Sequence, residues 1–239
     1  MSLRQSWDAR RLALAGLLAA GTVLASCGSD TSKTEGGRIA LETAKGLASK
    51  ILPGKKGSAA PNAPDPETLA AAAKSSISGP IVLAQIETTG LLTVLGEIGR
   101  NGATRTYATP NQQTLLFRNG LLVGSRGLGD DLMSADLGNA AALVTRRQSG
   151  ATNRTYRYLD GEAIERPLPV QCTITTGGTK SFRFAETNYA TVQMDERCQS
   201  RQGLNISNTY WVTADGQVAL SRQWIGPTLG HVTIQLVRP

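Results

Sequence analysis

The sequence predicts a mainly β domain, an antiparallel meander that closes into a barrel-like or two-sheet arrangement behind one short N-terminal helix. Three observations lead to this fold class. Turn-forming dipeptides recur between β-prone segments, the last segment has the composition of a strand, and little of the chain reads as helix. Because a meander has an apolar face and two open edges, it must curl into a barrel or stack as a sandwich.

The folded domain is expected to begin at Asp65 and to extend to residue 239. Asp65 can cap a helix, Pro66 suits the first helical position, and Glu67 complements the positive end of the helix dipole. We expect this helix over residues 68–75. It should stop before Ser78-Gly79-Pro80, which breaks the chain.

Hairpins are predicted wherever Asn or Asp precedes Gly, since a type I′ turn needs positive φ at both central residues. The four such dipeptides are Asn101-Gly102, Asn119-Gly120, Asp160-Gly161 and Asp215-Gly216. Gly177-Gly178 predicts a fifth hairpin, between strands at 173–176 and 180–184. Residues 232–237 are expected to form a closing strand.

Residues 1–26 are predicted to be a secretion signal. A basic start precedes an apolar run from Leu12 to Leu24, which is shorter than the roughly 20 residues that span a bilayer. The segment ends in Leu-Ala-Ser-Cys, which resembles the lipobox of bacterial lipoproteins. This resemblance implies cleavage before Cys27 and acylation of its thiol and new amino group. The competing interpretation is a plain secretory signal followed by a chance Cys.

Residues 27–64 are expected to form a tether between the lipidated Cys27 and the domain. The stretch 59–66 is rich in Pro and Ala and cannot hold a helix. Gly28 follows the acylated Cys, whereas an Asp there retains lipoproteins on the inner membrane of enteric bacteria. We therefore expect a lipid anchor in the outer membrane, with the domain on the periplasmic face.

Charge excludes one class of partner and leaves another open. The formal net charge of +7 becomes +5 without residues 1–26, because that segment holds three Arg and one Asp. There is no basic block with interleaved aromatics, so the sequence shows no nucleic-acid footprint. A mild basic excess is compatible with an acidic partner such as an anionic polysaccharide or lipid headgroups.

The remaining cysteines, Cys172 and Cys198, form an even pair in an oxidising compartment and predict a disulfide. Closing this loop should stabilise the fold by about 3–4 kcal/mol. The alternatives are a metal pair or a catalytic thiol. With His231 as the one histidine, neither has a visible partner set, and no cofactor or metal is expected.

The densest polar cluster is the segment 126–136, which contains Arg126 and the carboxylates Asp130, Asp131 and Asp136. It fits a cation site, a carboxylate pair for glycan hydrolysis, or a loop capped by Asp and tied to Arg126. Asp130 and Asp131 would point to different sides of an extended chain, and the EF-hand pattern is absent. We favour the capped loop.

Two further residues have both a chemical and a plain structural interpretation. His231 lacks a partner nucleophile and is interpreted as a loop residue next to Gly230. Trp224, at a predicted strand end, is a candidate platform for stacking a sugar, but ordinary core or cross-strand packing is the interpretation that we favour.

Several motifs together resemble those of the YjbF/GfcB lipoprotein family, which is associated with secretion of exopolysaccharide and group 4 capsule. They are the lipobox, Asn101-Gly102, the segment 126–136, Tyr210-Trp211 and the segment 221–227. The resemblance implies a mostly β, barrel-like periplasmic domain. It also implies work beside other export proteins, including a large outer-membrane β-barrel partner. It transfers no catalytic residues.

Three functions follow as hypotheses. The first is a non-enzymatic accessory of polysaccharide secretion that binds export proteins, with polysaccharide itself as a further partner. Its candidate contacts are Arg126, Asp130, Asp131, Asp136 and Trp224. The second is a periplasmic glycan hydrolase or lyase that uses the three Asp residues. The third is a structural envelope protein or an assembly factor for the partner barrel.

Overall fold

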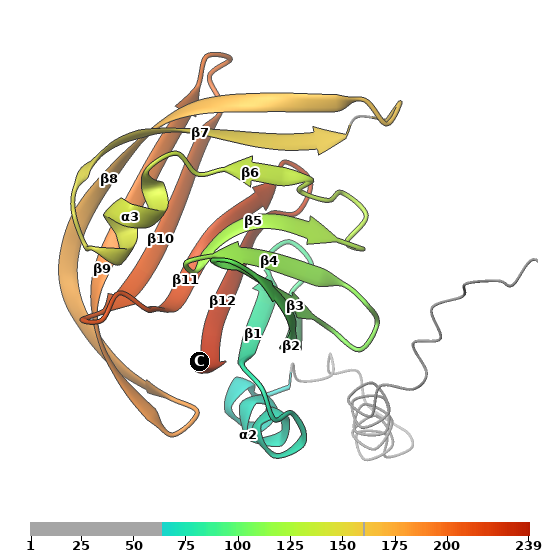
Figure 1. Cartoon of the computed structure of the whole chain (residues 1–239), viewed down its shortest axis with the longest axis vertical. Helices are drawn as coiled ribbons and strands as arrows, with labels where there is room; N and C mark the ends of the chain where they lie inside the picture. Colours follow the sequence, from blue (N-terminus) through green and yellow to red (C-terminus); the bar gives the residue numbers. More distant parts are fainter. Residues whose placement is uncertain (1–63, 160) are drawn as a thin grey trace, which may run out of the picture. The chain divides into compact units, whose positions relative to one another are not determined.

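The computed structural model describes residues 64–159 and 161–239, which form one antiparallel sheet of twelve strands curled into a nearly closed barrel (Figure 1). The predicted signal, Cys27 and the tether up to residue 63 lie outside the described residues. The elements are α2 (Pro66–Ser76), β1 (Ile81–Ile86), β2 (Leu91–Asn101), β3 (Thr104–Ala108), β4 (Thr114–Arg118), β5 (Leu121–Arg126), β6 (Ser134–Asp136), α3 (Ala140–Thr145), β7 (Gly150–Leu159), β8 (Glu165–Phe184), β9 (Thr187–Ser200), β10 (Asn205–Thr213), β11 (Val218–Gly226) and β12 (Gly230–Arg238).

The strand order confirms the predicted meander and its closure. Except for β5 and β6, strands that follow one another in sequence pair as antiparallel neighbours, and β12 pairs with both β11 and β1. The predicted closing strand therefore joins the start of the domain to its end. The sheet ends at β5 and β6, which are consecutive in the chain, so the one seam of the barrel lies between them.

Connections between paired strands lie at all four Asn-Gly and Asp-Gly sites, although Asp160 itself lies outside the described residues. At Asn101-Gly102 and Asp215-Gly216 only the glycine has positive φ, so these two turns are not of type I′. At the turn between β4 and β5, Asn119 has φ 51° and Gly120 has φ 81°, the positive values that a type I′ turn needs. The fifth predicted hairpin is wrong. Gly177-Gly178 lies within β8, where the register with β9 shifts between Thr176 and Thr179. The two glycines form a bulge in a long strand instead of a turn.

The N-terminal helix forms as predicted and packs against the sheet. The Asp65 carboxylate accepts the Thr68 backbone N–H at 2.9 Å, which caps α2. Its buried Ala70 and Ala73 pack against a cluster that includes residues of β1 and β12. Near the other end of the helix, the Arg238 guanidinium donates to backbone carbonyls, including Gly79 O at 2.8 Å. Neither helix in the described part of the chain is long and apolar enough to cross a bilayer.

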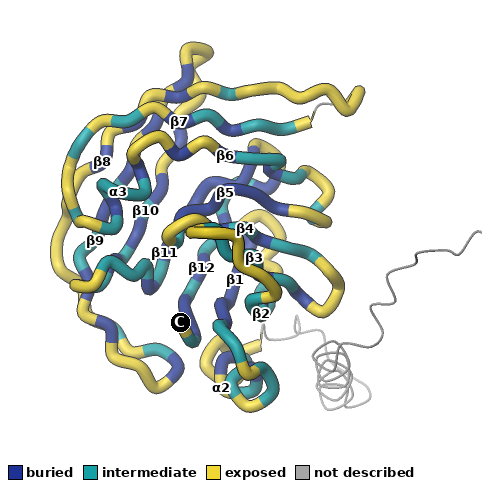
Figure 2. Tube along the Cα trace, in the orientation of Figure 1, coloured by how far each residue is buried: buried dark blue, intermediate teal, exposed yellow. Residues whose placement is uncertain are grey.

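Strand β5 is buried along almost its whole length (Figure 2), and its residues belong to two apolar clusters. Leu122 belongs to the larger cluster, while Leu121 and Val123 pack with α3 in the other. Gln223 of β11 accepts the Leu122 N–H at 2.8 Å and donates to Gly120 O at 2.9 Å. This buried amide satisfies backbone groups that an edge strand would otherwise leave unpaired.

Candidate functional site

A cluster of buried polar side chains lies inside the barrel. Strand alternation turns Arg154 of β7, Glu196 of β9, and Asn208 and Tyr210 of β10 inward. Glu196 Oε2 accepts hydrogen bonds from Arg154 Nη1 at 2.7 Å, Asn208 Nδ2 at 2.7 Å and the Tyr210 hydroxyl at 2.8 Å. None of the four residues is more than 2% exposed. A buried charge pair of this kind persists because each charge has a partner.

This cluster also contains polar atoms without a protein partner. Glu196 Oε1, Arg154 Nε and the Tyr156 hydroxyl are buried, and none makes a hydrogen bond within the described residues. Buried atoms of this kind are the ones that internal water commonly binds in proteins. The cluster therefore keeps buried polar atoms whose hydrogen-bonding capacity the described residues do not use.

Burial fixes the protonation of the two tyrosines. It raises the pKa of Tyr156 to about 12. Burial also raises the pKa of Tyr210 well above its usual 10, and the negative charge of Glu196 adds to that effect. Both phenols are therefore protonated at neutral pH, which suits Tyr210 as a hydrogen-bond donor to Glu196. A general acid or base would need a pKa near the working pH instead.

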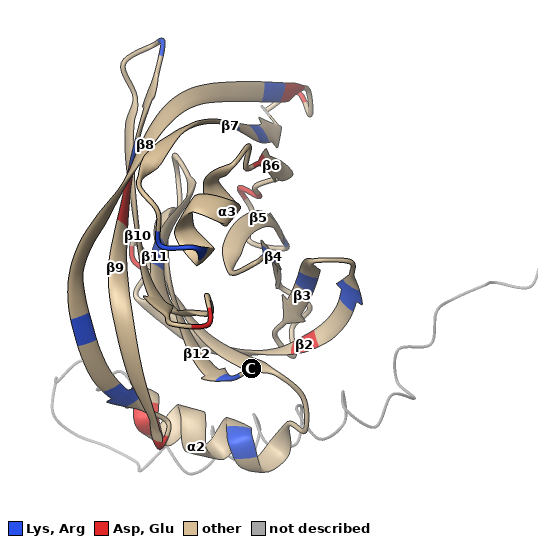
Figure 3. Ribbon diagram, turned by 60° about the vertical axis from the view of Figure 1, so that its left-hand side comes forward, with Lys and Arg blue, Asp and Glu red and all other residues tan. Residues whose placement is uncertain are grey.

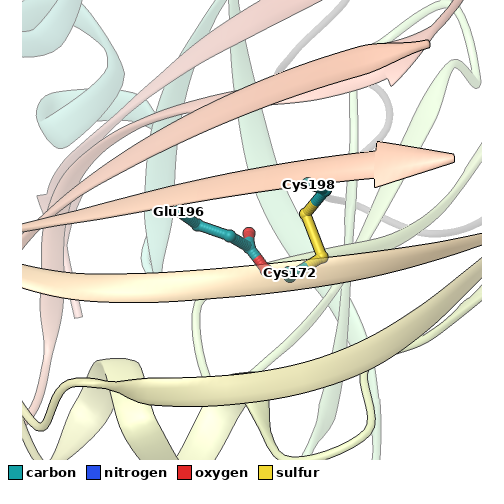
Figure 4. A group of neighbouring side chains, drawn as sticks. All are labelled: Cys172, Glu196 and Cys198. Atoms are coloured by element: carbon teal, nitrogen blue, oxygen red, sulfur yellow. A yellow bond between two sulfur atoms is a disulfide. The ribbon is translucent and has the colours of Figure 1, made fainter. Parts of the chain in front are cut away.

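The predicted disulfide forms between Cys172 of β8 and Cys198 of β9, which face each other across the two strands. Glu196 lies beside it (Figure 4). A ligand atom of each of the three side chains lies within 4.8 Å of the others. The two sulfurs are bonded to each other, so neither is the thiolate that a metal ion binds. The pair ties two strands together in the structure.

The segment 126–136 folds as the capped loop that the sequence favours. The Asp131 carboxylate accepts hydrogen bonds from Ser125 Oγ at 2.8 Å, Gly127 N at 2.7 Å and Leu128 N at 3.2 Å. Arg126 donates to the carbonyls of Leu132 at 3.2 Å and Met133 at 3.1 Å. The Ser125 N–H also binds Leu132 O at 2.9 Å. These contacts join the last residues of β5 to the chain entering β6, so the loop closes the barrel seam.

The three predicted carboxylates have different surroundings and do not form one site. Asp131 is held within the loop, whereas Asp130 is exposed at its surface. Asp136 is also exposed and accepts the Gly138 N–H at 3.0 Å, as a turn cap does. Two of the three carboxylates in the segment 126–136 therefore bind backbone groups of the same segment or of the turn that follows it.

The two remaining candidates lie in strands. Trp224 is only 7% exposed and packs edge-on against Tyr156 and Tyr158, so little of its ring is available to a sugar. The interpretation of His231 as a loop residue is wrong, because it lies in β12 opposite Trp224. Its Nε2 is 2.8 Å from Ser207 O.

Sequence reasoning missed Arg154 and Glu196, the most deeply buried charge pair among the described residues. A signal for Glu196 was present. It lies two residues before Cys198 and two after Met194, so a strand places all three on one face. Along the ribbon of the described residues, Lys, Arg, Asp and Glu occur on several strands and turns (Figure 3).

The chain is similar to one family of known proteins and to solved structures. The model of the family described as "Group 4 capsule polysaccharide lipoprotein gfcB, YjbF" matches residues 48–237. The hypothetical lipoprotein YmcC from Escherichia coli K12 has a similar solved structure, with a TM-score of 0.63 and 18% identity over 72% of this chain and 89% of that one.

A Bacteroides fragilis protein with a YmcC-like fold is more distant. Its TM-score is 0.30 at 9% identity, over 66% of this chain and 93% of that one. No curated protein matches the sequence. The likeness to YmcC shows that the fold is shared.

Proposed function

This chain belongs to the YjbF family of group 4 capsule polysaccharide lipoproteins, and on that basis we propose that it is a non-enzymatic accessory of polysaccharide secretion. In this proposal its lipidated Cys27 anchors it in the outer membrane. The barrel then works in the periplasm by binding proteins of the export machinery, including an outer-membrane β-barrel. Polysaccharide is a further partner.

The family match carries the proposal, because it extends over almost the whole of the described domain. The non-enzymatic part is supported by how the candidate acidic groups are used. Asp131 binds two backbone amides and a hydroxyl, Asp136 caps a turn, and Glu196 is buried against Arg154. Each of these carboxylates has a structural role, so its presence does not require a catalytic one.

Deleting the gene tests the role in secretion. We expect less secreted polysaccharide, while polysaccharide continues to be made inside the cell, and restoration by the wild-type gene. The variant Cys27→Ser should leave the membrane fraction and restore secretion poorly, because several acyl chains are needed for lasting attachment. Normal secretion in the deletion strain would contradict the proposal.

Two further measurements separate this function from the others. A pull-down from membranes should recover the partner barrel only when polysaccharide is present. Recovery whether or not polysaccharide is made would instead favour the structural protein or assembly factor. Incubating the purified protein with the host's own polysaccharide should leave chain length unchanged. Shortening of the chains that is lost in Asp130→Asn, Asp131→Asn or Asp136→Asn would instead favour the hydrolase or lyase.

A further inference from the structure

Four amide side chains form one row across the outer face of β7, β8, β9 and β10. The strand register places Asn153 opposite Gln171, Gln171 opposite Gln199, and Gln199 opposite Asn205. All four are exposed. Because neighbouring strands are about 4.8 Å apart, the row, which we call the amide row, is about 14 Å long. These strands lie next to one another on one side of the barrel (Figure 1).

The amide row lines an open depression of about 780 Å³. Arg197 lies in the adjacent row, opposite Thr173, and is the one charged residue in the lining. None of the described residues that line the depression is acidic. Cys172 and Cys198 line it as well, so the disulfide ties together the two strands that supply its centre. The depression is therefore polar and mildly positive, and a disulfide cross-links two of the strands that line it.

Three of the four amides in the row and Arg197 are free to bind, whereas Asn205 Nδ2 donates to Gly203 O at 3.4 Å. The side chains of Asn153, Gln171, Gln199 and Arg197 make no hydrogen bond or ion pair within the described part of the chain. Asp195, one row further on, has both carboxylate oxygens bound by Gln193 Nε2 at 3.0 Å. An unpaired donor can exchange water for a ligand without breaking an internal bond.

The chemistry of the row indicates the kind of ligand. An amide offers a carbonyl acceptor and two N–H donors, which match the hydroxyl groups of a sugar. A guanidinium matches a carboxylate, which it binds through two parallel hydrogen bonds. We propose that the amide row and Arg197 bind a strand of acidic polysaccharide, laid across β7 to β10. This inference rests on the proposed function and names the surface that meets the polymer.

Binding to three defined polymers tests the inference. The purified full-length lipoprotein, kept in detergent, is titrated with polygalacturonate, dextran and polyglutamate. We expect polygalacturonate to bind tightest, since it alone combines hydroxyls with carboxylates, and its affinity should fall as salt is raised. Absence of polygalacturonate binding, or equally tight binding of polyglutamate, would overturn the proposal. The second result would indicate an acidic protein partner.

Variants locate the binding to this surface. Arg197→Gln should lower the affinity for polygalacturonate about tenfold and flatten its salt dependence, because a charge-assisted hydrogen bond is lost. The double variant Gln171→Ala/Gln199→Ala should lower it similarly without changing the salt dependence. Arg183→Gln is the matched control, since Arg183 is exposed on β8, the strand that pairs with the strand of Arg197, but does not line the depression. Equal losses in the control, or none in the other variants, would contradict the assignment.

A secretion assay separates failure of this inference from failure of the proposed function. In the deletion strain, the triple variant with Gln171→Ala, Gln199→Ala and Arg197→Gln should restore secretion less well than wild type. Full restoration by the triple variant would overturn the binding surface while leaving the proposed function intact. Normal secretion in the deletion strain itself would count against the function, and polymer titration would then decide the surface alone.

Discussion

Glu196 and Arg154 meet inside the barrel at 2.7 Å, with no more than 2% of either side chain exposed. They come from β9 and β7, and Asn208 and Tyr210 of β10 bind the same carboxylate oxygen. A single acidic side chain therefore links three strands through its hydrogen bonds, with an intact disulfide beside it.

Removing the charge of Glu196 should strongly destabilise the fold. In Glu196→Gln, Arg154 stays buried without a counter-charge, and we expect the free energy of unfolding to fall by about 3–5 kcal/mol. Urea denaturation measures this value. Glu186→Gln is the control, because Glu186 is exposed and solvent screens its ion pair with Lys74, so its loss should change stability little. Similar losses in both variants would show that the buried pair has no special role.

Removing the disulfide should also lower stability. The double variant Cys172→Ala/Cys198→Ala opens a cross-link that spans 26 positions, for which chain entropy gives about 3–4 kcal/mol. Cys27→Ser is the matched control, since it removes a cysteine without touching this bond. A loss below about 1 kcal/mol in the double variant, measured in urea, would contradict the expectation.

Asp131 should matter to the loop far more than its neighbour Asp130. Asp131→Ala leaves the donors Ser125 Oγ, Gly127 N and Leu128 N unpaired, at a cost of about 1–3 kcal/mol. We expect a lower melting temperature and faster hydrogen exchange at the Gly127 and Leu128 amides. Asp130→Ala, at the exposed position, should change stability by less than about 0.5 kcal/mol. Equal effects would mean that the carboxylate does not shape the loop.

His231 should titrate below the 6.5 of a free imidazole, because burial lowers its pKa more than the bond to Ser207 raises it. The lowered pKa stabilises the fold above about pH 6.5, and this contribution is lost as pH falls through the folded-state pKa. NMR reads the one imidazole directly. Glu87→Gln should lower the pKa further, because it removes a nearby negative charge, while Arg222→Gln should raise it. A wild-type pKa above 6.5 would contradict this prediction.

Local signals were sufficient for most of the strand pattern. Asn119-Gly120 determines a tight turn because both residues tolerate positive φ, and Asp65 with Pro66 determines where α2 begins. The Gly177-Gly178 hairpin failed because glycine permits a bulge as readily as a turn. Pairing with β9 on both sides of the glycines decided between them.

The sequence by itself determined the β class, the closing strand, the Cys172–Cys198 pair and a loop over 126–136 that is capped by Asp, since local residue chemistry specifies each of these. The tertiary structure alone decided which side chains share a face across strands. Glu196 meets Arg154, and Asn153 stands in line with Gln199, through strand register. Register depends on pairing between distant segments, and a shift of one residue would move every side chain to the other face.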